Sequence, residues 1–319
     1  MVNYSGTVFG NKAKGFDEPT QLPRDEAERR EWQAANKAWW ESTPMRYDWR
    51  DEIAAAPGTK EYFREIDDRF LTSARKYMPW RELPFEALIP FASLADKDVL
   101  EIGTGQGTHA QLIVPHCKSF TGIDLTAAAS QMTARRLAAF NIPGKILQMD
   151  AENMEFPDNS FDYVWSWGVI HHSANTRRIL EEMHRVLRPG GKATIMIYHR
   201  SWWRYYFNGS LQYVFRRQFR EHAGFHAIAQ GATDGAIARY YRPDEWRKIA
   251  KSFFDVDSFR VYGLKTEILP LPPGRLKAAL ERLIPDAVAR LLTNRLRFGM
   301  FLVADMRKSP LGSVSAHPT

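Results

Sequence analysis

One segment of the chain reads Asp98-Val99-Leu100-Glu101-Ile102-Gly103-Thr104-Gly105-Gln106-Gly107-Thr108. Its short apolar run at residues 99–102 predicts a buried strand. The loop that follows has glycine at alternate positions, and glycine lets the backbone approach a ligand closely because it has no Cβ. A predicted helix at residues 109–114 comes next, and the free N–H groups at its start favour an anionic group. The segment therefore predicts a strand, a ligand-binding loop and a helix.

Two classes of nucleotide ligand compete for this loop. The dinucleotide fingerprint has the spacing G-x-G-x-x-G, whereas the third glycine here, Gly107, comes one residue too early. An acidic residue, Glu101, also lies two positions before the first glycine. The resulting E-x-G-x-G-x-G pattern resembles the first motif of class I S-adenosylmethionine-dependent methyltransferases. A glycine-rich turn that binds no ligand is the alternative at this point.

Length and composition narrow the class of protein. The chain has 319 residues, of which 44% are hydrophobic, enough for one large domain or one domain with a cap. Its single cysteine, Cys117, excludes an internal disulfide framework and a cysteine-based zinc cluster, and we expect a reducing, cytoplasmic compartment. No apolar run approaches the ~20 residues of a membrane span. Residues 1–30 also lack the apolar core of a signal peptide.

Charge and aromatic content are less decisive. The formal net charge of +7 would suit nucleic acid or an anionic membrane surface, but the basic residues are dispersed along the chain. Ten tryptophans, several of them outside the glycine-loop region, indicate a pocket, an interface or simply a core.

The first 90 residues predict an N-terminal appendage of irregular chain and helices. Helices are expected at residues 28–40 and 60–77, the second with Phe63, Ile66 and Phe70 spaced for one face. Between them, residues 39–49 carry several large aromatic side chains and Pro44, which ends the first helix. We expect the appendage to pack near the nucleotide site, and packing away from it is an equal alternative.

The middle of the chain alternates between strands and helices. Further strands are expected at residues 119–125, 145–149, 161–167 and 192–198, with helices at 127–140 and 175–188 and a tight turn at 189–191. This alternation predicts a parallel sheet with helices on both faces. In such sheets, ligands bind beyond the carboxyl ends of the strands.

The C-terminal part predicts strands at residues 254–262 and 299–306 and a helical pair at 274–293 divided by Pro285. The expected fold is α/β: a doubly wound, Rossmann-like, seven-stranded and mostly parallel sheet with an antiparallel last strand. An N-terminal helical appendage and inserted helices that form a cap complete it. We expect the appendage at 1–90, the main domain at 91–308 with cap insertions at 201–242 and 264–297, and a disordered tail at 309–319.

The resemblance to class I methyltransferases is close over residues 97–200 and looser over 243–308. Asp124 closes the second strand about twenty residues after the glycines, and Asp150-Ala151-Glu152 closes the third. Residues 150–162 are similar to the family's segment between the third and fourth strands. Residues 185–191, with the sequence RVLRPGG, are similar to its turn before the fifth strand.

The resemblance implies S-adenosylmethionine as cofactor. Asp124 would accept hydrogen bonds from both ribose hydroxyls, which suits a carboxylate. Asp150 would accept one from the adenine amino group, and Glu101 would orient the loop or the methionine amino group. The other cofactor contacts that it implies are Gly103, Thr104, Gly105, Gln106, Gly107, Leu125, Ala151, Glu152 and Trp167.

Four residues are candidates for catalysis. His171 and His172 follow the fourth strand, and Tyr198 and His199 end the fifth. A histidine there could act as a general base near neutral pH, or have an architectural role. Attack on a sulfonium methyl depends mainly on alignment and exclusion of water, so no obligatory base is predicted. The two histidines are adjacent and lack a third ligand, so no metal site is expected.

The implied reaction is methyl transfer to a small, partly apolar acceptor. Its chamber is expected to come from the added segments 39–49, 202–220 and 274–294, with Trp40, Tyr47, Trp202 and Tyr206 as candidates. One alternative is an RNA or protein methyltransferase, which the arginines and aromatic residues of 202–220 support. Another is a non-catalytic cofactor-binding subunit. Nucleic acid is the less expected partner, peripheral membrane contact is a further possibility, and the oligomeric state is not predicted.

Overall fold

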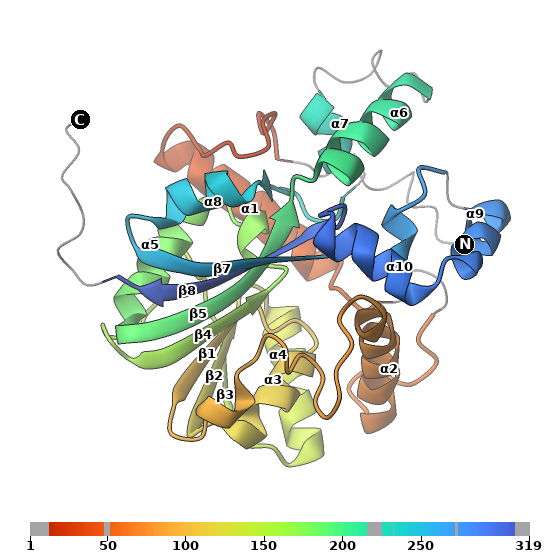
Figure 1. Cartoon of the computed structure of the whole chain (residues 1–319). Coiled ribbons are helices and arrows are strands. Elements are labelled where there is room, and N and C mark those ends of the chain that lie inside the picture. Colours follow the sequence, from red (N-terminus) through yellow and green to blue (C-terminus); the bar gives the residue numbers. More distant parts are fainter. Residues whose placement is uncertain (1–12, 48–51, 216–224, 232, 272–273, 310–319) are drawn as a thin grey trace.

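The computed structural model describes residues 13–47, 52–215, 225–231, 233–271 and 274–309. Its sheet has the strand order β3-β2-β1-β4-β5-β8-β7 (Figure 1). The strands of this order are β1 (Asp98–Ile102), β2 (Ser119–Asp124), β3 (Lys145–Gln148), β4 (Phe161–Trp167), β5 (Leu187–His199), β7 (Phe254–Tyr262) and β8 (Phe301–Lys308).

The first five strands are parallel, and β8 runs antiparallel to both β5 and β7. This confirms the predicted mostly parallel sheet with an antiparallel last strand. A short strand that was not predicted, β6 (Tyr240–Tyr241), pairs with the end of β5 at Tyr198 and His199. The last strand also begins two residues later than expected.

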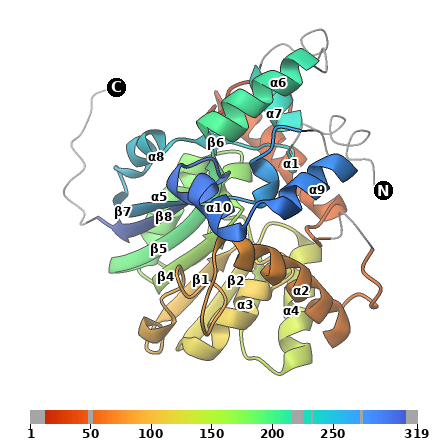
Figure 2. The same ribbon diagram turned by 45° about the vertical axis from the view of Figure 1, so that its right-hand side comes forward.

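Helices cover both faces of the sheet, as the alternation of the sequence predicted (Figures 1 and 2). The hydrophobic core on one face contains α5 and α8, and the core on the other contains α2, α3 and α4. Their bounds are α2 (Lys60–Tyr77), α3 (Thr108–Ile113), α4 (Ala127–Phe140), α5 (Thr176–Val186) and α8 (Pro243–Ala250).

Side-chain caps explain where several helices begin. Thr126 accepts a hydrogen bond from the backbone N–H of Ala129 at the start of α4, and Asn175 accepts one from Arg178 at the start of α5. Such caps satisfy amides that have no partner within the helix. The cap of α4 comes two residues after the end of β2, whereas η3 (Ile170–His172) separates the end of β4 from the cap of α5.

The expected turn at residues 189–191 lies inside a strand. Helix α5 ends at Val186, and β5 begins at once because Leu187 pairs with Phe161. The register then shifts, and pairing resumes between Lys192 and Tyr163. Gly190 adopts a φ of +75° within this irregularity. The segment is therefore a bulged start of β5, which was predicted five residues later.

Two insertions and the N-terminal helices gather around the carboxyl ends of the parallel strands (Figure 2). The N-terminal helix is α1 (Glu26–Ser42). The first insertion contains the π-helical turn η4 (Trp202–Phe207), α6 (Asn208–Phe215) and α7 (Phe225–Gly231). The second contains η6 (Lys265–Glu267), α9 (Arg275–Leu283), α10 (Asp286–Arg290) and the π-helical turn η7 (Leu291–Arg295).

Some expectations fall on parts of the chain that the structure leaves undescribed. Trp49 of the aromatic segment, residues 216–220 of the first insertion and residues 310–319 of the tail all lie outside the described residues. Ser309, the first residue of the expected tail, is described and buried. Among the helices that are described, none is long and apolar enough to cross a bilayer.

Candidate active site

A cavity of about 1020 Å³ lies at the carboxyl ends of the parallel strands. One end is lined by residues 103–106, 124–126 and 149–151, which are the glycine loop and the ends of β2 and β3. The other end is lined by aromatic and polar side chains of η3 (Ile170–His172), β5 and the first insertion. The cavity therefore joins the loop expected to bind a nucleotide to the segments expected to bind an acceptor.

The three loop glycines all have positive φ, at +79°, +54° and +78° for Gly103, Gly105 and Gly107. A Cβ on Gly103 would overlap Val169 Cγ2 and lie 2.8 Å from its Cγ1. A Cβ on Gly105 would have no atom within 4 Å, and this glycine lines the cavity. Gly103 is therefore required for packing, whereas Gly105 leaves space for a ligand. Gly107, which precedes α3, is not among the lining residues.

A buried ion pair holds the loop from behind. Arg136 of α4 pairs with Asp67 of α2 and donates to the Gln106 carbonyl oxygen at 3.2 Å. Thr108 Oγ1 donates to Asp67 at 2.8 Å and accepts from Arg136 at 3.1 Å. This ion pair could not be predicted from the sequence, because its members lie far apart in the chain and belong to no local pattern.

Asp124 closes β2 at the edge of the cavity. Its Oδ1 accepts hydrogen bonds from Thr126 N at 3.0 Å and Thr126 Oγ1 at 2.8 Å, and its Oδ2 accepts one from Gly105 N at 3.2 Å. Burial raises the pKa of this carboxyl group, and the hydrogen bonds oppose the rise. Asp124 therefore connects the end of β2 to the glycine loop and to the cap of α4.

The two acidic residues after β3 have different surroundings, one in the cavity and one against α1. Asp150 lines the cavity, and its Oδ1 accepts hydrogen bonds from Gln33 Nε2 at 2.9 Å and Glu152 N at 2.8 Å. Glu152, expected to contact the cofactor, is buried outside the lining. Its carboxylate accepts from Arg29 at 2.8 Å and from the backbone N–H of Asn175 at 2.7 Å. It joins α1 to the start of α5.

Helix α1 is fastened across this end of the cavity at two further points. Gln33 Oε1 accepts a hydrogen bond from Ala174 N at 3.0 Å. Glu41 accepts from Ala127 N and Ala128 N, at 3.0 and 2.9 Å, and so caps the start of α4. Of the two packing alternatives for the appendage, the structure shows the one close to the nucleotide end.

Glu101 lies beneath the loop and not in the cavity lining. Its side chain is 2% exposed, and its Oε2 has no hydrogen-bond partner among the residues that the structure describes. His109 Nδ1 lies 4.0 Å from Oε1, and burial lowers the pKa of this histidine to about 3, so the two form no ion pair near neutral pH. Burial raises the pKa of Glu101 well above the usual 4.5.

This burial predicts a pH-dependent effect of Glu101→Gln. Because the carboxyl pKa is higher in the folded than in the unfolded protein, wild-type stability falls as pH rises above about 4.5. Glutamine cannot ionise, so the variant does not lose stability in this way. Relative to wild type, its free energy of unfolding should rise by on the order of 1 kcal/mol by about pH 8. Urea unfolding without cofactor at both ends of this range measures the difference. Glu61→Gln, at a glutamate that is 70% exposed, is the control. Parallel pH profiles for Glu101→Gln and wild type would contradict the expectation.

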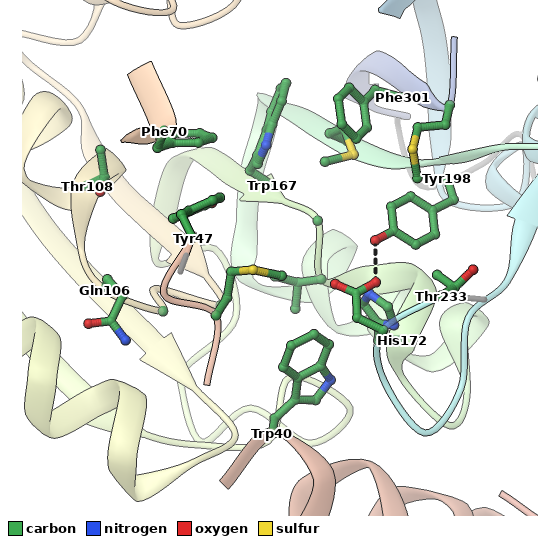
Figure 3. Close-up of a pocket in the computed structure, with 18 of the residues that line it drawn as sticks. Trp40, Tyr47, Phe70, Gln106, Thr108, Trp167, His172, Tyr198, Thr233 and Phe301 are labelled. Carbon is green, nitrogen blue, oxygen red and sulfur yellow. Dashed lines mark hydrogen bonds between the residues drawn. The ribbon is translucent and has the colours of Figure 1, made fainter. Parts of the chain in front are cut away.

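Of the four catalytic candidates, two line the cavity (Figure 3). His172 Nδ1 lies 2.6 Å from the Ile237 carbonyl oxygen, which can only accept, so Nδ1 carries a proton and donates it. Tyr198 Oη donates to Asp234 Oδ1 at 2.7 Å. The carboxylate of Asp234 was not identified from the sequence, since residue 234 belongs to no motif.

The other two candidates lie behind the lining. His171 is fully buried with its ring centre 3.9 Å from that of Tyr198, and burial lowers its pKa well below the usual range. His199 is buried, with its Nδ1 2.8 Å from the Gly299 carbonyl oxygen. Neither residue lines the cavity, so these two candidates do not face its interior, and His171 has the position expected for the architectural alternative.

Of the four residues expected to line the acceptor chamber, two line the cavity and two do not. Trp40 and Tyr47 line the cavity, and Figure 3 shows them with Trp167, Tyr198 and Phe301 around one space. Trp202 and Tyr206 do not line it and are 55% and 42% exposed. The π-helical turn η4 instead directs Arg204 and Tyr205 to the cavity. The described part of the block therefore contributes to the cavity, but through other residues than the two that were expected.

The remaining expected cofactor contacts line the cavity, namely Thr104, Gln106, Leu125, Ala151 and Trp167. The lining also contains four residues that were not predicted from the sequence, Gln33, Met149, Met196 and Met300. No group of three or more His, Cys, Asp or Glu side chains in the described part of the chain is arranged to hold a metal ion.

Comparison with known proteins places this site in a family. Residues 100–195, from β1 into β5, match the model of a methyltransferase domain. The chain is 41% identical over 101 residues to phthiotriol/phenolphthiotriol dimycocerosates methyltransferase 1 of Mycobacterium ulcerans, covering 31% of this chain and 36% of that protein. It is 31% identical over 122 residues to demethylmenaquinone methyltransferase of Porphyromonas gingivalis, covering 37% and 49%.

A third relative matches over more of the chain. The tRNA U34 carboxymethyltransferase of Methylococcus capsulatus is 27% identical over 202 residues, which cover 54% of this chain and 62% of that protein. The chain thus spans between 36% and 62% of the length of these three relatives. The part of this chain that matches the domain model contains the glycine loop and the acidic ends of β2 and β3. Residues 100–195 therefore form a methyltransferase domain, and the resemblance to class I S-adenosylmethionine-dependent enzymes lies in this same part of the chain.

Proposed function

We propose that the protein transfers a methyl group from S-adenosylmethionine to a small, partly apolar acceptor and releases S-adenosylhomocysteine. The observation that carries the proposal is that one continuous cavity joins the glycine loop to a chamber of aromatic side chains. The match to a methyltransferase domain supports the cofactor, and the residues that line the cavity support the class of acceptor.

The loop end of the cavity fits the cofactor. Asp124 would accept from the ribose hydroxyls and Asp150 from the adenine amino group, as in the family that the sequence resembles. Gly105 leaves the backbone open toward the cavity, and the start of α3 offers a positive dipole end. Asp150 already accepts from Gln33, so we propose that α1 shares in building the adenine end.

The middle of the cavity would carry the transfer. When bound, the cofactor supplies a sulfonium-activated methyl group. The rings of Trp40, Tyr47 and Trp167 would align the acceptor and exclude water from it. Tyr47 stacks on Phe70 with ring centres 4.8 Å apart, and Trp40 packs edge-on against His172 at 5.0 Å. These contacts hold two of the rings in fixed orientations.

The far end of the cavity contains polar groups that could receive a proton from an acceptor. The Asp234 carboxylate accepts from Tyr198, and His172 Nδ1 donates to the Ile237 carbonyl oxygen. We propose that these three side chains orient a hydroxyl or amino group of the acceptor toward the methyl group. An acceptor that is apolar apart from such a group fits this arrangement.

A second candidate function is methylation of RNA. The relative that matches over the greatest share of this chain, among the three described above, is named for a tRNA position. The other two are named for demethylmenaquinone and for phthiotriol dimycocerosates. Transfer of label from methyl-labelled S-adenosylmethionine into a cell extract distinguishes the candidates, because the label would enter the organic-solvent fraction or the RNA.

Trp40→Ala tests the proposed chamber. If Trp40 contacts the acceptor, S-adenosylhomocysteine affinity by calorimetry should stay within about threefold, while methyl transfer falls at least tenfold, roughly 1.4 kcal/mol in the transition state. Trp80→Ala makes the same change at a half-buried tryptophan outside the cavity and is the matched control. Wild-type transfer by a folded Trp40→Ala protein would place the chamber elsewhere. Failure of wild type to bind S-adenosylhomocysteine would overturn the proposed function itself.

A further inference from the structure

The large hydrophobic side chains that are exposed in the described residues are not scattered. Apart from Leu22, they all belong to two segments, 202–207 and 276–296. These are Trp202, Tyr206, Phe207, Leu276, Leu280, Leu283, Val288, Leu291 and Leu296. The same two segments contribute to the lining of the cavity, through Arg204 and Tyr205 in the first and Ala278, Glu281, Arg282 and Asp286 in the second. Exposed apolar side chains therefore surround one side of the cavity.

Helix α9 is the clearest case, because none of its residues is buried. Leu276, Leu280 and Leu283 are spaced for one helix face, and Leu276 and Leu283 are 69% and 77% exposed. The cavity-lining residues Ala278, Glu281 and Arg282 occupy the other side of the helix. A surface helix of a globular protein normally turns its apolar stripe to the core. In α9, the stripe faces away from it, and the helix lies at the periphery of the molecule (Figures 1 and 2).

The charge of this segment is strongly positive. Residues 275–297 contain six basic and two acidic side chains. Both acidic groups are already paired, Glu281 with Lys277 and Asp286 with Lys265. Arg275, Arg295 and Arg297 are exposed beside the leucines. The surface thus combines an apolar stripe with an excess of cations.

We propose that α9, α10 and η7 dock on an anionic lipid bilayer, with the leucines of α9 entering the interface. An apolar helix face bordered by arginines is the pattern of helices that lie in the plane of a membrane surface. Trp202 on η4 adds an aromatic side chain of the kind enriched at that depth. Docking in this orientation would bring the cavity to the membrane. An acceptor dissolved in the bilayer would then enter without crossing water, a consequence that rests on the proposed function.

Co-sedimentation with vesicles tests the proposal, using phosphatidylcholine alone and phosphatidylcholine mixed with phosphatidylglycerol. Wild type should bind the mixed vesicles and lose binding in high salt. The triple variant Leu276→Asp, Leu280→Asp, Leu283→Asp should bind at least about tenfold more weakly, as should Arg275→Glu combined with Arg295→Glu. Leu22→Asp changes an exposed leucine outside the surface and should bind as wild type does. Circular dichroism establishes that each variant is folded.

Several results would overturn the proposal. The proposal is wrong if wild type binds neither kind of vesicle. It is also wrong if a folded triple variant binds vesicles as strongly as wild type. A third contradicting result is a wild-type protein that is dimeric in solution and a triple variant that is monomeric, because a second copy of the chain would then cover the stripe. The vesicle assay needs neither cofactor nor acceptor. Calorimetry with S-adenosylhomocysteine on the same samples therefore shows separately whether the proposed function holds.

Discussion

Gly103→Ala is expected to lower the free energy of unfolding by about 2–5 kcal/mol, through left-handed backbone strain and overpacking. The residue has a φ of +79°, and an added Cβ would overlap the side chain of Val169. Val169 follows β4, and Gly103 follows β1, so the clash would force apart two neighbouring strand ends. Urea unfolding without ligand measures the loss.

Gly105→Ala is the matched control, because it places the same methyl group two residues further on. Its φ is +54°, but the new Cβ would meet no atom within 4 Å. We expect a loss of stability of only about 1–2 kcal/mol, from backbone strain. Since Gly105 lines the cavity, its main effect should be weaker binding of S-adenosylhomocysteine. Equal destabilisation by the two substitutions would show that contact with Val169 is not what requires glycine at position 103.

Asp124→Ala should weaken binding of S-adenosylhomocysteine by about 2–4 kcal/mol, because two hydrogen bonds from ribose hydroxyls to a charged group would be lost. Calorimetry measures the affinity, and NADH, which should not bind, tests the choice of nucleotide. The side chain also receives hydrogen bonds from Gly105 and Thr126, so part of the loss would come from a less ordered loop. A folded Asp124→Ala protein with unchanged affinity would refute this role.

Two further variants separate the direct and indirect parts of this effect. Thr126→Ala removes the hydroxyl that donates to Asp124 and caps α4, but leaves the carboxylate in place. It should lower stability by about 0.5–2 kcal/mol, as the loss of a helix cap does, with a smaller change in affinity. Asp124→Asn retains one acceptor oxygen and should fall between wild type and Asp124→Ala.

The α/β core could be predicted because its signals are local. Strand β4 and helix α2 have the bounds that the sequence predicted, since each is one apolar pattern between clear breaks. The glycines at 103, 105 and 107 and the acidic ends at Asp124 and Asp150 follow from the same pattern of strand ends. All five positions lie at or after the carboxyl ends of β1, β2 or β3, and four of them, all but Gly107, line the cavity.

The rest of the site depends on contacts between distant parts of the chain, which no local pattern encodes. Glu152 is a carboxylate at a strand end, as expected of a ligand contact. Its two oxygens instead accept hydrogen bonds from Arg29 and from the start of α5. Trp202 and Tyr206 belong to the expected aromatic segment, but the π-helical turn directs their neighbours inward. A helical wheel of 3.6 residues per turn could not have shown this.

The covering of the cavity by α1 also bears on how the protein is made. The partners of α1 at Asp150, Glu152 and Ala174 lie 117, 123 and 141 residues further along the chain. During synthesis, α1 leaves the ribosome long before these partners exist, whereas the strand pairs β1–β2 and β2–β3 close short loops soon after they emerge. We therefore expect the nucleotide end to assemble in two stages, sheet first and cover last. A chain whose synthesis stops before residue 174 would have the glycine loop without the complete cover.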